Sequence, residues 1–95
     1  MKESHAKAIK EILDSFDFEK VRTYMHLVGW KYFDTPGVPS IQRLRETAEE
    51  LLQNAANRGE GSWACGGFKA SFFEGGEESP QLSLDFIAVH KEVYI

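Results

Sequence analysis

The spacing of apolar residues changes once along this chain, near Gly59, and this change constrains the fold more than any other feature. Before Gly59, apolar residues recur every three or four positions, which is typical of amphipathic helices. After it, they recur at every second position, which is typical of strands with one buried face. The chain has 95 residues, close to the common size of one domain. We therefore expect a single α+β domain over residues 1–95, with helices first and strands after them.

Three helices are predicted, over about residues 5–16, 17–30 and 41–58. A residue that can cap a helix N-terminus stands at or before the start of each: Ser4, Asp17 and Ser40. Each helix carries one apolar stripe at helical spacing. The stripes are Ile9, Ile12, Leu13 and Phe16; then Val21, Tyr24, Met25 and Val28; then Ile41, Leu44, Ala48, Leu51, Leu52 and Ala55.

Two strands are predicted after the helices, over about residues 62–73 and 81–90, joined by a polar, glycine-rich connection. Gly66-Gly67 interrupts the first strand and indicates a bulge or bend there. A two-stranded hairpin is not stable alone. The sequence therefore predicts an antiparallel hairpin whose apolar face packs on the helices.

The outer face of this hairpin is predicted to be partly apolar. Phe68 and Phe72 alternate toward the helices, which turns Trp63, Phe73 and Ile87 to the other side. A register shift at Gly66-Gly67 would instead turn Trp63 inward and leave Phe73 and Ile87 to mark the outer face. An exposed apolar face needs cover. The cover is expected from the last three residues, from a second copy of the chain or from a partner protein. A symmetric homodimer is the simplest way to cover the outer face, because both subunits use the same apolar surface.

Aromatic residues gather where the second helix ends, at Trp30-Lys31-Tyr32-Phe33, just before a proline-containing loop. Three aromatic rings within four consecutive residues cannot all enter one core. They either fill the core under the loop or remain exposed as anchors for a partner, and interface hot spots favour Trp and Tyr. The candidate partner-binding residues are Trp30, Tyr32, Phe33, Phe73 and Ile87.

The residues that could carry catalysis form no recognisable pattern. Cys65 is the only cysteine, which excludes an intramolecular disulfide. Its pairing with His5, His26 or His90 would suit a small cysteine-dependent enzyme, but a buried structural thiol is the favoured interpretation. One cysteine and scattered histidines lack the spacing of a zinc site. No catalytic, cofactor-binding or metal-binding residue is predicted.

Charge is distributed unevenly. The net charge is −4, and it lies entirely in residues 59–95, because acids and bases balance in the helical part. This field opposes nucleic-acid binding. An alternative nucleic-acid surface would comprise Lys20, Arg22, Lys31, Arg43 and Arg45. There is no apolar leader and no run long enough to span a bilayer, so we expect no membrane contact and a cytoplasmic location.

The chain resembles a group of small, uncharacterised bacteriophage and prophage proteins over about residues 16–88. The resemblance lies in the following features: Leu27-Val28-Gly29-Trp30-Lys31-Tyr32, Val38-Pro39-Ser40, Leu44, Thr47-Ala48, Leu51-Leu52, Gly66-Gly67-Phe68, Ala70, Leu82, Leu84 and Phe86. It implies an accessory gene product acting in a bacterial host, with no assigned activity. The leading hypothesis is a noncatalytic accessory protein that binds another protein, such as a host or defence factor, and the cysteine-dependent enzyme is the alternative.

Overall fold

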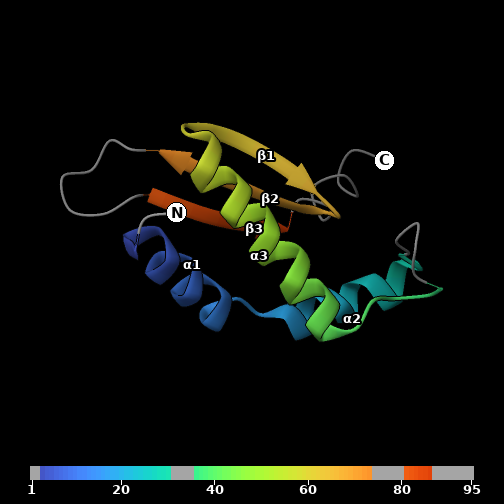
Figure 1. The fold of residues 1–95 in the computed structure, drawn as a ribbon. Coiled ribbons are helices and arrows are strands. Elements are labelled where there is room, and N and C mark those ends of the chain that lie inside the picture. The colour runs from blue at the N-terminus through green and yellow to red at the C-terminus, as the bar shows by residue number, and fades with distance from the viewer. Residues whose placement is uncertain (1–2, 31–35, 74–80, 87–95) are drawn as a thin grey trace.

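A computed structural model describes residues 3–30, 36–73 and 81–86 of the chain. It confirms the α+β fold: three helices are followed by an antiparallel sheet (Figure 1). The elements are α1 (Glu3–Ser15), α2 (Phe18–Val28), α3 (Ile41–Arg58), β1 (Gly61–Cys65), β2 (Phe68–Phe73) and β3 (Gln81–Phe86). The expected second strand over 81–90 corresponds to β3, and residues 87–90 lie outside the described residues.

Two helix starts follow the capping residues that the sequence indicates. The Asp17 carboxylate accepts a hydrogen bond from the Lys20 amide at 3.0 Å, and α2 begins at the next residue. The Ser40 hydroxyl accepts one from the Arg43 amide at 3.1 Å at the start of α3. In α1, however, Ser4 lies inside the helix, because α1 already includes Glu3. The capping role expected for Ser4 is therefore wrong.

The end of α2 is set by Gly29, and it comes earlier than the predicted residue 30. Gly29 adopts a left-handed conformation with φ 68° and ψ 34°. The Trp30 amide donates to the Met25 carbonyl at 2.8 Å, and the Gly29 amide donates to the His26 carbonyl at 3.4 Å. These two bonds form a Schellman motif, which closes a helix and favours glycine at the left-handed position.

The segment predicted as one strand over 62–73 is two strands, β1 and β2, joined at Gly66-Gly67. Both glycines have positive φ, 60° and 90°, as a two-residue type I′ turn requires. Cys65 and Phe68 flank this turn as register partners. The two glycines therefore reverse the chain instead of forming the expected bulge or bend. The sheet has three strands in the order β1-β2-β3.

The turn also changes which face of the sheet Trp63 occupies. Trp63 lies opposite Ala70, and Ala70 lies opposite Leu84 on the next strand. Directly opposed residues share one face of an antiparallel sheet. Trp63 is therefore on the inner face, with the core residues Ala70 and Leu84. Its expected position on the outer face is wrong, because a reversal in place of a bulge resets the alternation in β1.

The core lies between the inner face of the sheet and the helices. Helix α3 crosses that face and contacts all three strands, with α1 and α2 packed beside it (Figure 1). Phe68 is fully buried at the centre, and its ring packs against Phe16, Phe18 and Phe86 with centroid distances of 5.9, 6.0 and 5.5 Å. The buried cluster comprises Ile9, Leu13, Phe18, Val21, Met25, Leu44, Ala48, Leu51, Leu52, Ala55, Phe68, Ala70, Phe72 and Leu84.

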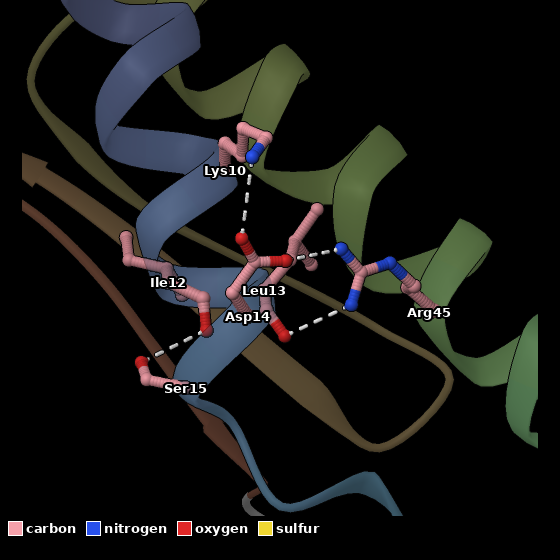
Figure 2. Close-up of polar contacts among 6 residues, drawn as sticks. All are labelled: Lys10, Ile12, Leu13, Asp14, Ser15 and Arg45. Carbon is pink, nitrogen blue, oxygen red and sulfur yellow. Dashed lines mark hydrogen bonds and ion pairs between the residues drawn. The ribbon is translucent and has the colours of Figure 1, made fainter.

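Two arginines connect segments that are distant in sequence. Arg45 on α3 donates to the Asp14 carboxylate at 2.7 Å and to the Leu13 carbonyl at 3.1 Å, both on α1 (Figure 2). Arg22 on α2 donates to the carbonyl of the buried Pro39 at 2.8 Å, just before α3. These bonds fix α1 and α2 against α3 at the periphery of the core.

Candidate functional site

The residues predicted to bind a partner do not form one described site. Tyr32, Phe33 and Ile87 lie outside the described residues. Trp30 follows the end of α2, whereas Phe73 ends β2 at the opposite end of the sheet (Figure 1). Trp30 and Phe73 therefore belong to separate surfaces.

Trp30 packs inward against the first hairpin. Its ring lies 6.1 Å from the Phe86 ring, which also contacts Tyr24 at 5.7 Å. The Gly67 backbone is so close that a Cβ atom there would lie 2.8 Å from Phe86 Cε1 and 3.2 Å from Trp30 Cζ2. The Trp30 Nε1 atom is buried, and no described residue forms a hydrogen bond with it. Trp30 is thus partly buried and extends the core around the Gly66-Gly67 turn.

Phe73 is half exposed, at 50%, on the outer face of the sheet. The other described residues of that face are small or polar: Ser62, Ala64, Lys69, Ser71, Gln81, Ser83 and Asp85. Ser62, Ser71 and Ser83 form a row across the three strands, and the Ser62 and Ser71 hydroxyl groups are 2.8 Å apart. Of the three residues expected to make this face apolar, Phe73 lies on it, Trp63 is on the inner side and Ile87 lies outside the described residues. The described outer face is therefore mainly polar apart from Phe73.

Among the described residues, the large apolar side chain with the greatest exposure is one that the sequence pattern did not mark as a candidate. Leu27 is 80% exposed, and the adjacent Val28 is 41% exposed, so Val28 does not continue the buried stripe of Val21 and Met25. We call this pair the apolar end of α2. Helical spacing held a usable signal, because Leu27 is two positions after Met25 and so points to nearly the opposite side of the helix.

Cys65 is exposed at the end of β1, not buried as expected. It lines a groove of about 350 Å³ together with residues of α3: Arg43, Glu46, Thr47, Glu50, Leu51 and Asn54. No histidine is among these lining residues of the described chain. His5 packs against Phe72, at the opposite end of β2 from the turn beside Cys65, and His26 lines another groove. The third histidine considered as a partner for Cys65, His90, lies outside the described residues.

Arg22 and Arg45, which belong to the alternative nucleic-acid surface, form hydrogen bonds within the fold. Arg22 donates to Pro39, and Arg45 contacts Leu13 and Asp14. The Arg45 hydrogen bond, together with the nearby Lys10 and Arg45 charges, lowers the pKa of Asp14 against the opposing effect of desolvation. The contact holds Arg45 beside α1, and Lys31 lies outside the described residues.

The comparisons with known proteins add no assignment. No protein-family model, curated protein or solved structure matches the chain. Within residues 3–30, 36–73 and 81–86, no group of three or more His, Cys, Asp or Glu side chains is placed to hold a metal ion. In the same residues, no helix combines the length and apolar character that crossing a bilayer requires.

Proposed function

We propose that this chain is a noncatalytic accessory protein of a phage or prophage that acts in the bacterial cytoplasm by binding another protein. Its resemblance to small phage proteins supports the origin. The apolar end of α2 supports the mode of action: Leu27, 80% exposed, is the observation that carries it. Covering a large, water-exposed aliphatic side chain with a partner protein lowers the free energy of the complex.

The apolar end of α2 is preorganised for such a contact. The Schellman motif at Gly29 fixes the last turn of the helix, and the buried Phe18, Val21 and Met25 fix its opposite side. Leu27 and Val28 are therefore presented without a large ordering cost on binding, which favours affinity. Tyr32 and Phe33 follow Val28 by four and five residues and remain predicted partner-binding residues.

The experiment compares capture of proteins from a bacterial host lysate by immobilised wild type and by Leu27→Glu. The substitution lies on the solvent side of α2, so it should leave the circular dichroism spectrum and the melting temperature nearly unchanged. Loss of an apolar anchor should weaken capture of a specific partner about tenfold or more. The purified partner is then titrated against both proteins.

Phe73→Glu provides the matched control, because it places the same charge on a half-exposed apolar position at the other end of the sheet. Retention of the partner by Phe73→Glu and its loss with Leu27→Glu supports the proposal. The reverse result places the contact on the sheet and overturns the assignment to α2. Equal capture by all three proteins also overturns it.

The same Phe73→Glu variant tests the proposed homodimer through the outer face. Sedimentation equilibrium of the wild type should show self-association that the variant loses, because an isologous contact would bring two Phe73 side chains or their neighbours together. A wild type that remains monomeric at high concentration would contradict a homodimer while leaving the proposal for α2 intact.

A further inference from the structure

The free edge of β1 runs beside the groove under α3, and the contact proposed above uses neither feature. β1 is the first strand of the sheet, and within residues 3–30, 36–73 and 81–86 no strand pairs with its outer side. Cys65, at the end of this strand, also lines the groove with α3. The edge and the groove are therefore parts of one surface.

The hydrogen-bonding groups on this edge follow from the register. Cys65 and Phe68 flank a two-residue turn, and residues in that position form a hydrogen-bonded pair. In an antiparallel strand, backbone groups alternate between the two sides. The amide and carbonyl groups of Ser62 and Ala64 therefore point away from β2, and both residues are exposed.

β1 lacks the features by which natural edge strands discourage pairing. Its sequence, Gly61 to Cys65, contains no charged residue and no proline, whereas lysine, proline and bulges usually protect an edge. The opposite edge strand, β3, carries the charged residue Asp85. Of the two sheet edges, that of β1 is the better suited to accept another strand.

The charges that line the groove indicate which kind of side chain a strand paired with β1 would place there. Its lining holds two carboxylates, Glu46 and Glu50, against one guanidinium, Arg43. Arg43 and Glu50 are seven residues apart, or about 10 Å along the helix axis. Thr47 and Asn54 lie within about one turn of Glu50 on α3, and Cys65 lines the same groove from β1. This region favours a long cationic side chain.

The geometry points to strand addition at this edge: an extended segment of a partner protein pairs with β1, and a Lys or Arg side chain enters the groove beside Glu50. Backbone bonds to Ser62 and Ala64 would provide affinity, and the groove would provide the preference for a basic side chain, as in other strand-addition complexes. Side chains of an added strand alternate in direction, so those on the inner side would face α3 next to Cys65.

The test uses Cys65 as a reporter, since it is the only cysteine of the chain and lies in the groove. The probe is an eight-residue peptide of alternating threonine and valine with one central lysine. At saturation it should slow alkylation of Cys65 by iodoacetamide about tenfold, because a covered thiol reacts only from the open state. A peptide with glutamate in place of lysine, and a backbone N-methylated lysine peptide, should both protect much less.

Variants of the chain separate the two contributions to binding, the backbone hydrogen bonds to β1 and the contact with Glu50. Ala64→Pro removes one outward amide and should abolish protection, and the N-methylated peptide tests the same bonds if this variant does not fold. Glu50→Gln should weaken binding of the lysine peptide, and Glu49→Gln, one position along α3 and outside the groove lining, is its matched control. Leu27→Glu should have no effect, which separates this surface from the apolar end of α2.

Three results would overturn the inference. The first is unchanged alkylation at millimolar lysine peptide. The second is equal protection by the lysine and glutamate peptides, which would remove the role of Glu50. The third is protection without peptide that increases with protein concentration, which would identify a second copy of the chain as the occupant of the edge.

Discussion

The two faces of the sheet differ sharply although the same strands form both. On the inner face Phe68 and Ala70 are fully buried under α3, and Phe72 and Leu84 are nearly so. On the outer face Ser62, Ser71 and Ser83 stand in a row, and Lys69 lies opposite Asp85. Small and charged side chains tolerate water, so among the described residues of this face Phe73 is the large apolar side chain that the expected cover would protect.

The described large apolar side chains of the sheet, apart from Phe73, lie on the face that the helix layer covers. α3 contacts every strand, and Trp63 adds to the inner face instead of exposing an indole on the outer one. Arg58 lies 5.8 Å from the centre of the Trp63 ring and covers part of it. Among the described residues, the large apolar side chains left exposed are those at the apolar end of α2 together with Ile41 and Phe73.

The largest effect should come from Phe68→Ala on the inner face. Phe68 is fully buried and its ring contacts three other aromatic rings, so its removal should cost about 3–5 kcal/mol of the free energy of unfolding. Urea denaturation measures this value. Phe73→Ala, on the exposed end of the same strand, is the control and should cost less than about 1 kcal/mol. Similar losses for the two variants would contradict one-sided burial.

The next largest effect should come from Gly67→Ala, because the turn at Gly66-Gly67 determines which residues of β1 face inward. Gly67 has φ 90°, and an added Cβ would lie 2.8 Å from Phe86. Conformational strain and the clash together should cost roughly 2–4 kcal/mol.

Gly29→Ala is the control for strain alone, since φ is 68° but no atom lies within 4 Å of the added Cβ. It should cost about 1–2 kcal/mol. Thermal unfolding compares the two. A smaller loss for Gly67→Ala than for Gly29→Ala would argue against the close packing of Trp30 and Phe86 on the turn.

A smaller effect is expected on the outer face, from Ser62→Ala. This change removes the 2.8 Å hydroxyl contact with the buried Ser71, which should cost about 1 kcal/mol. Ser83→Ala, at the exposed end of the same row, should be close to neutral. A double-mutant cycle on Ser62 and Ser71 measures their coupling, and zero coupling would show that the outer face contributes nothing through this pair.

The smallest effect should come from Asp14→Asn, at the exposed edge of the helix layer behind the inner face. The pKa of Asp14 is lowered, mainly by the hydrogen bond from Arg45, so its ionised form is favoured in the folded protein. The resulting stabilisation is present above the unfolded-state pKa and is lost as the pH falls through the lower folded-state pKa. The melting temperature of the wild type should slightly exceed that of Asp14→Asn at pH 7, and the difference should disappear in acid. A difference independent of pH would contradict the ion-pair explanation.

The sequence by itself determined those features whose cause lies within a few residues. The change of apolar spacing near Gly59 predicted helices followed by strands. Asp17 and Ser40 predicted the starts of α2 and α3, because their side chains bond to amides three residues later. Local hydrogen bonds of this kind depend on residue type and spacing alone, so they are readable without the fold.

The tertiary structure decided the features that depend on contacts between distant residues. Gly66-Gly67 fits both a bulge and a two-residue turn. In the structure β1 is antiparallel to β2, and Trp30 and Phe86 pack against the turn. The turn placed Trp63 inward and Cys65 beside α3. Likewise, Arg45 contacts Asp14, 31 positions away. Contacts between residues that are distant in sequence select among conformations that are equivalent locally. The spacing of residues within one segment does not predict these contacts.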